Sequence, residues 1–100
     1  MDYITERDRI YAKSPEGEVI AEVTFPAVDG VNVINHTFVH ESLRGKGIAG
    51  ELVKLAADSI LSDGRKIGVT CPYAVEWFKR HPEYVVIHPG SATCRIDGRR

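Results

Sequence analysis

The hydrophobic pattern of this chain changes its period near residue 40, and this change limits the folds that the chain can adopt. Before it, segments 9–13 and 18–25 alternate apolar and polar residues, and 31–39 is rich in β-branched and aromatic residues, as in strands. After it, from Ile48, apolar residues form one stripe at the 3.6-residue spacing of a helix. The sequence therefore predicts three strands followed by a helix of about 47–62.

Turn signals indicate how the three strands are connected. The segment "SPEGE" at 14–18 has the Pro and Gly of a hairpin turn, and "VDG" at 28–30 provides the next reversal. The three strands are therefore expected to form an antiparallel meander. Gly64, in "SDGRK", is a suitable stop for the helix that follows.

The second half of the chain adds two strands and a helix. The strand "KIGVT" at 66–70 returns after the first helix, which predicts parallel pairing in a right-handed unit. Pro72 opens a second helix, "PYAVEWFKR", which His81-Pro82 terminates, and "YVVIH" at 84–88 is the last strand. The order β-β-β-α-β-α-β predicts an α+β fold with one mixed β-sheet and two main helices.

Length and charge exclude several classes of protein. One hundred residues suit a single domain, expected at 1–88, and the polar, basic segment 89–100 is expected to be a disordered tail. A net charge of −1 predicts no general attraction to nucleic acid or to an anionic membrane. No apolar run approaches the roughly 18 residues of a membrane span, and the N-terminus lacks the apolar core of a signal peptide.

The two cysteines, Cys71 and Cys94, lack the spacing of metal ligands. No further cysteine is present to form a C-x-x-C pair with either of them. We therefore expect free thiols, no metal cofactor and a cytoplasmic location.

The turn "LRGKGIAGE" at 43–51, between the third strand and the long helix, has the composition of an anion site. The first N–H groups of a helix have no intrahelical partner and carry partial positive charge. Gly45 and Gly47 allow a phosphate to approach because they have no Cβ. Arg44 and Lys46 add cations suited to a pyrophosphate. The alternative is a tight turn with solvated basic residues.

The same turn also contains the G-x-G-x-x-G pattern of dinucleotide-binding folds, at Gly45, Gly47 and Gly50. Those folds require a carboxylate at the end of the next strand, where this chain has Val69-Thr70-Cys71. Three strands also precede the turn, and no Walker pattern is present. We therefore reject a dinucleotide site and expect Gly50 to serve helix packing.

A different pattern in this turn, R-x-x-G-x-A, is formed by Arg44, Gly47 and Ala49. Together with its neighbours at 36–56, it resembles the acyl-CoA-binding signature of the GNAT N-acetyltransferase superfamily. The segment "CPYAVEWFKRHPEY" at 71–84 is similar to a compact single-domain GNAT-like subfamily. The resemblance implies a GNAT-like fold. This fold is expected to be truncated relative to full-length members, because their N-terminal strand and two helices are not recognisable here.

The resemblance also implies where the coenzyme binds. The backbone of the turn would hold the pyrophosphate of acetyl-CoA, and the end of the preceding strand would contact the pantetheine. The implied coenzyme-binding residues are Phe38, Val39, His40, Arg44, Gly45, Lys46, Gly47, Ile48 and Ala49.

Three residues are candidate catalytic groups, because in this superfamily the thioester lies where two strands splay apart. Cys71, at the cap of the second helix, would accept the acetyl group or act as an acid; alternatively, it is a small semi-buried residue. Tyr73 would donate a proton to the thiolate, or else serve in packing. Glu41 would assist a base-bound water, or else be a solvated loop carboxylate.

The leading hypothesis is an enzyme that moves an acetyl group from acetyl-CoA to an unidentified amine or thiol. The acceptor would be a small molecule or a protein amine, and the protein a monomer or a homodimer. The alternative is a non-catalytic acyl-CoA-binding module, which the missing N-terminal helices favour. An interaction domain with a structural glycine turn is a weaker third reading.

Overall fold

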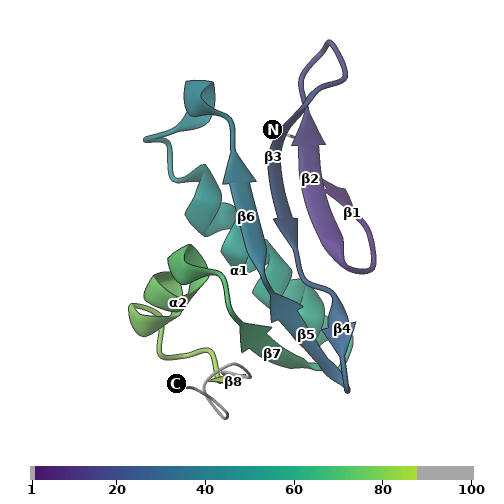
Figure 1. Cartoon of the computed structure of the whole chain (residues 1–100), viewed down its shortest axis with the longest axis vertical. Helices are drawn as coiled ribbons and strands as arrows, with labels where there is room; N and C mark the ends of the chain where they lie inside the picture. Colours follow the sequence, from purple (N-terminus) through teal and green to yellow (C-terminus); the bar gives the residue numbers. More distant parts are fainter. Residues whose placement is uncertain (1, 88–100) are drawn as a thin grey trace.

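The computed structural model describes residues 2–87 of the chain (Figure 1). Its elements follow one another as β1 (Ile4–Thr5), β2 (Arg9–Lys13), β3 (Val19–Thr24), β4 (Ala27–Val28), β5 (Val31–Ile34), β6 (His36–Val39), the 3₁₀ helix η1 (Glu41–Leu43), α1 (Ile48–Ser62), β7 (Lys66–Val69), α2 (Pro72–Lys79) and β8 (Val86–Ile87). The predicted tail, 89–100, lies outside the described residues, as does position 88 of the predicted last strand.

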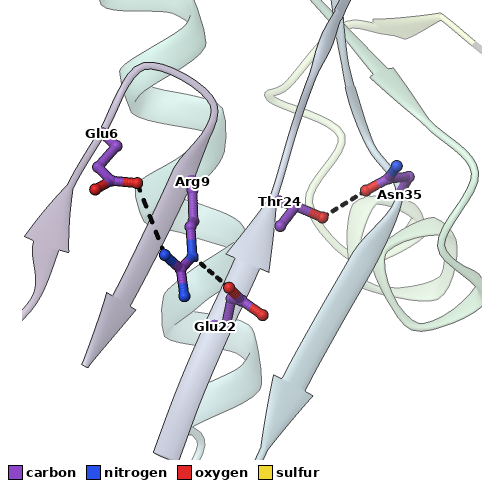
Figure 2. Close-up of polar contacts among 5 residues, drawn as sticks. All are labelled: Glu6, Arg9, Glu22, Thr24 and Asn35. Carbon is purple, nitrogen blue, oxygen red and sulfur yellow. Dashed lines mark hydrogen bonds and ion pairs between the residues drawn. The ribbon is translucent and has the colours of Figure 1, made fainter. Parts of the chain in front are cut away.

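The first sheet has the strand order β1-β2-β3-β6, and each neighbouring pair is antiparallel. One row of opposed residues is Ala12, Ala21 and Val39, on the face that α1 covers. Among residues 2–87, no helix covers the opposite face, and polar side chains contact one another on it. Figure 2 shows Arg9 between Glu6 and Glu22 on this face, with α1 behind the sheet. The predicted antiparallel meander is confirmed for its first two strands and for the second half of the third.

The predicted strand 31–39 is divided between two sheets. Its first half, β5, pairs in parallel with β7 in a second sheet of order β4-β5-β7-β8, and its second half, β6, pairs with β3. At the division, the N–H of Asn35 donates to the Thr24 carbonyl at 3.2 Å, and the hydroxyl of Thr24 donates to the Asn35 side chain at 2.6 Å (Figure 2). The α+β class is confirmed, but two sheets replace the single sheet that we expected.

Helix α1 joins the two sheets by packing behind both of them (Figure 1). Its bounds agree with the predicted 47–62 to within one residue. The stripe that it buries consists of Leu52, Val53, Ala56, Ala57 and Ile60. This stripe belongs to one core cluster with Ile10 and Val23 of the first sheet and Ile34 and Ile67 of the second.

The second helix, α2, was predicted at 72–80 and ends one residue earlier, at Lys79. It begins at Pro72, where a missing N–H costs nothing, and it buries Ala74, Trp77 and Phe78. In the described part of the chain, no helix is both long and apolar enough to cross a membrane.

Candidate active site

The first turn of α1 leaves several backbone N–H groups without a partner. Gly47 is the N-cap residue, and the first helical N–H to reach a carbonyl is that of Glu51, which donates to Gly47 at 3.1 Å. Within residues 2–87, the N–H groups of Ile48, Ala49 and Gly50 have no carbonyl acceptor. No side chain caps the helix either. The helix therefore presents free donors and partial positive charge at this end.

The two glycines before α1 are needed for their backbone conformation. Gly45 has a φ of +83° and Gly47 a φ of +75°, in the left-handed region that other residues seldom adopt. A Cβ added at either position would meet no atom within 4 Å. The turn is therefore open around both glycines.

A pocket of about 210 Å³ lies at this helix end. It is lined by Val39, Leu43, Arg44, Gly45, Gly47, Ile48, Ala49 and Tyr73. Most of the coenzyme-binding residues expected from the sequence are brought together here. Lys46 is exposed on the same turn but does not line the pocket. Leu43 was missed because the short 3₁₀ helix that carries it has no recognisable sequence pattern.

The end of β6 contributes fewer residues to the pocket than expected. Val39 lines it, whereas Phe38 points to the opposite face of the sheet, since neighbouring residues of a strand alternate. His40 does not line the pocket either. Its Nδ1 accepts a hydrogen bond from the N–H of Ser42 at 3.1 Å, so His40 caps the 3₁₀ helix.

Cys71 lies where the two sheets separate. The N–H groups of Thr70 and Cys71 both donate to the Ile34 carbonyl, at 3.0 Å and 3.1 Å, and mark the last link between β5 and β7. Beyond it, β6 pairs with β3 in the first sheet, whereas β7 belongs to the second. The thiol of Cys71 is 3.6 Å from the Thr37 hydroxyl, and the residue is only 7% exposed.

Tyr73 reaches from α2 to the pocket and remains 41% exposed. Its hydroxyl would be 3.3 Å from a Cβ added at Gly50, and Trp77 Nε1 would be 3.0 Å from the same point. Gly50 therefore allows α2 to approach α1 closely, which confirms the packing role expected for it. Tyr73 also lines the pocket together with Ile48 and Ala49, whose N–H groups are free.

The remaining candidate, Glu41, is the exposed first residue of the 3₁₀ helix and does not line the pocket. A carboxylate that the sequence did not reveal is closer to the helix start. Glu51, in the first turn of α1, accepts a hydrogen bond from the hydroxyl of Tyr3. Burial first, and then this hydrogen bond and the charge of Glu51, raise the pKa of Tyr3 above its ordinary range.

No group of three or more metal-ligating side chains occurs among residues 2–87. The pocket at the start of α1 offers free N–H donors, an arginine, apolar walls and a tyrosine hydroxyl.

Known proteins resemble this chain in sequence. A family model described as GCN5-related N-acetyl-transferase matches residues 9–87. Protein NATD1 of Xenopus tropicalis is 37% identical over 49 residues, which is 49% of this chain and 45% of that protein. The human NATD1 protein matches with the same identity over 49 residues, 43% of its length. The matches thus span less than half the length of these curated relatives.

Solved structures resemble it in fold. A GCN5-like protein from Staphylococcus aureus superposes with a TM-score of 0.70 at 24% identity, covering 87% of this chain and 88% of that one. A ribosomal-protein-alanine N-acetyltransferase from Brucella melitensis superposes with a TM-score of 0.57 at 22% identity, covering 88% and 67%. At these identities the likeness is one of fold. With the family model matching most of the described residues, the chain belongs to the GCN5-related N-acetyltransferase family.

Proposed function

We propose that this protein transfers the acetyl group of acetyl-CoA to an amine or a thiol. The observation that carries the proposal is the pocket at the start of α1, where free N–H groups, an open glycine turn and Arg44 meet. Membership of an N-acetyltransferase family supports the same reading.

The proposed coenzyme site has a polar end and an apolar side. The N–H groups of the first turn of α1 would donate to the coenzyme pyrophosphate, because they lack other acceptors in the described part of the chain. Arg44 would add charge-assisted hydrogen bonds from its guanidinium group. Val39 and Leu43 would face the pantetheine chain as apolar walls.

The reaction requires one proton to leave the acceptor and one to reach the coenzyme sulfur. When an amine nitrogen bonds to the acetyl carbon, the carbon–sulfur bond breaks and a thiolate leaves. We assign the proton donor for this thiolate to Tyr73, whose hydroxyl lies at the pocket. Glu41 would receive the amine proton through water, which its exposure permits.

Cys71 offers a second route, in which its sulfur accepts the acetyl group before the amine does. Its 7% exposure and its contact with Thr37 favour direct transfer instead. In direct transfer, Cys71 forms part of the wall where the strands separate.

Thermal denaturation with acetyl-CoA and with CoA tests the proposed site. Because only the folded protein binds, ligand at about 100 times its Kd adds about 2.7 kcal/mol to the free energy of unfolding. Arg44→Ala is expected to weaken binding about tenfold, by loss of charge-assisted hydrogen bonds. Arg80→Ala, which removes an exposed arginine elsewhere, is the control. No shift in wild-type melting temperature at millimolar coenzyme would exclude both coenzyme readings.

The alternative is a module that binds acyl-CoA without catalysis. Release of free CoA thiol, measured with a broad panel of amines and thiols, separates the two readings. Turnover that is lost in Tyr73→Phe while acetyl-CoA binding is retained supports the enzyme. Tight binding with no turnover across the panel supports the module.

A further inference from the structure

A second pocket, of about 440 Å³, lies at the other end of α1. It is lined by Arg7, Ala27, Asn32, Asp63 and Arg65, and Asp63 is the C-cap residue of the helix. The 15 residues of α1, at 1.5 Å per residue, separate its two ends by about 22 Å. This pocket is therefore distinct from the proposed coenzyme site.

The Arg65 side chain is held in place by a buried amide. Asn32 is only 4% exposed, and its Oδ1 accepts a hydrogen bond from Arg65 Nε. Its Nδ2 donates to the Phe25 carbonyl at 2.8 Å, so the orientation of the amide is fixed on both sides. Among residues 2–87, no acceptor is found for the N–H donors on Nη1 and Nη2 of Arg65, so they are left for another acceptor.

The backbone of Arg65 is fixed as well. Gly64 has a φ of +73°, and its N–H donates to the Leu61 carbonyl at 2.9 Å. The N–H of Arg65 donates to the Ile60 carbonyl at 3.1 Å, which completes a Schellman-type helix end. An arginine fixed at its backbone and at Nε is preorganised for binding, since little side-chain freedom remains to be lost.

The charges in the pocket are unbalanced. Within residues 2–87, no carboxylate oxygen lies within 4.0 Å of a nitrogen of Arg7 or Arg65, although Asp63 lines the same pocket. The lining contains two arginines and one aspartate, which gives it a formal net charge of +1. A single negative charge would neutralise the pocket, whereas a doubly charged phosphate would leave it with a net charge of −1.

We propose that this pocket binds a carboxylate group, with Arg65 donating from Nη1 and Nη2 and Arg7 adding a second cation. Guanidinium and carboxylate groups match in this two-bond geometry. A free carboxylic acid and the C-terminus of a peptide share this chemistry. The site is separate from acetyl transfer and does not depend on it.

Titration with N-acetylglycine, a monoanion, tests the proposal by ¹H–¹⁵N NMR of the Arg65 Nε–H signal at constant ionic strength. A saturable shift is expected, and Arg7→Gln should raise the Kd about tenfold through loss of a charge-assisted contact. Arg80→Gln, outside the pocket, should leave the Kd unchanged. The acetyl-CoA affinity of Arg7→Gln should equal that of the wild type.

Several outcomes would overturn the assignment. An equal response to the neutral analogue N-acetylglycinamide, or a shift that never saturates, would show that the carboxylate is not recognised. An unchanged Kd in Arg7→Gln, a variant that removes no hydrogen bond of the described fold, would overturn the role of Arg7 as the second cation. Tighter binding of inorganic phosphate than of N-acetylglycine would show that the pocket recognises a phosphate and not a carboxylate. Loss of acetyl-CoA binding in Arg7→Gln would show that the two sites are not separate.

A pentapeptide with a free C-terminus and its C-terminal amide distinguish the two sources of the carboxylate. Binding of the free peptide at least as tight as that of N-acetylglycine, with none for the amide, indicates peptide ends. Weaker binding of the peptide than of N-acetylglycine indicates small carboxylic acids.

Discussion

Gly45 and Gly50 lie five residues apart, and a side chain would destabilise the protein at each for a different reason. At Gly50 the reason is a close contact with α2, and at Gly45 it is the positive φ. At Gly50, a Cβ would be 3.0 Å from Trp77 Nε1 and 3.3 Å from the Tyr73 hydroxyl. We expect Gly50→Val to lower the free energy of unfolding by about 1–3 kcal/mol, because α2 must move away from α1. Urea denaturation measures this loss, and the emission of Trp77 should change in the folded variant.

Gly45→Ala is the matched comparison. A Cβ there meets nothing within 4 Å, so the cost arises only from the φ of +83° and should be about 1–2 kcal/mol. The emission of Trp77 should stay as in the wild type. An unaltered Trp77 spectrum in Gly50→Val as well would contradict the close helix contact.

Cys71 allows a test of the route of acetyl transfer. Because its side chain is 7% exposed and contacts Thr37, we expect no acetyl group on its sulfur during turnover. Intact-protein mass spectrometry after incubation with acetyl-CoA measures this. An acetyl adduct that is present in the wild type and absent in Cys71→Ala would instead establish an acyl-cysteine intermediate.

At the scale of elements, Asn32 connects the hairpin of β4 and β5 to the turn between α1 and β7. Asn32→Ala removes the partners of the Phe25 carbonyl and of Arg65 Nε in a buried place. We expect a loss of about 2–3 kcal/mol in the free energy of unfolding, measured with urea. Asn35→Ala, at an exposed site with one side-chain hydrogen bond, should cost about 1 kcal/mol or less. Equal losses in both variants would contradict the buried role of Asn32.

The contact of Tyr3, the residue before β1, with Glu51 of α1 should make stability depend on alkaline pH. Burial, followed by the hydrogen bond and charge of Glu51, raises the pKa of Tyr3 above its ordinary value of 10.0. The unfolded chain therefore releases this proton at a lower pH than the folded protein does. Stability that is fully present below about pH 10 is lost as the pH rises towards the folded pKa.

Comparison of the wild type with Tyr3→Phe isolates this effect. Urea denaturation between pH 9 and pH 11 should show a steeper fall in stability for the wild type than for the variant. Tyr84, whose pKa is also raised, first by burial and then by Asp58, is present in both proteins and cancels in the comparison. Parallel pH profiles would mean that Tyr3 is not held by Glu51.

The elements differ in how far the sequence could predict them. The 3.6-residue stripe of α1 and Pro72 at the start of α2 are local signals, and both helices were predicted to within one residue. The division of 31–39 was not, because both halves are equally strand-like. It depends on which distant neighbour each half joins, β7 or β3. Strands of two residues, such as β1 and β4, are too short to show a period.

At the scale of the whole molecule, the pocket at the start of α1 combines three separate parts of the chain. The turn residues could be singled out because R-x-x-G-x-A is a short pattern within one segment of the sequence. Tyr73 could be singled out because the resemblance to a known family extends to α2. The hydrogen bond from Tyr3 to Glu51 could not be foreseen, since it joins residues 48 positions apart without any pattern. Likewise, Arg7 and Arg65 are far apart in the sequence, so their shared pocket could not be predicted from it.

The shared core predicts how the molecule unfolds. Residues of both sheets and both helices belong to one buried cluster, with α1 at its centre. If α1 separates from one sheet, it also exposes the apolar face of the other. We therefore expect a single cooperative unfolding transition. Trp77 is the only tryptophan, so its fluorescence reports on α2, whereas far-ultraviolet circular dichroism reports on all elements. The two urea transitions should coincide in midpoint and slope; an earlier fluorescence transition would show that α2 and its pocket wall open independently of the sheets.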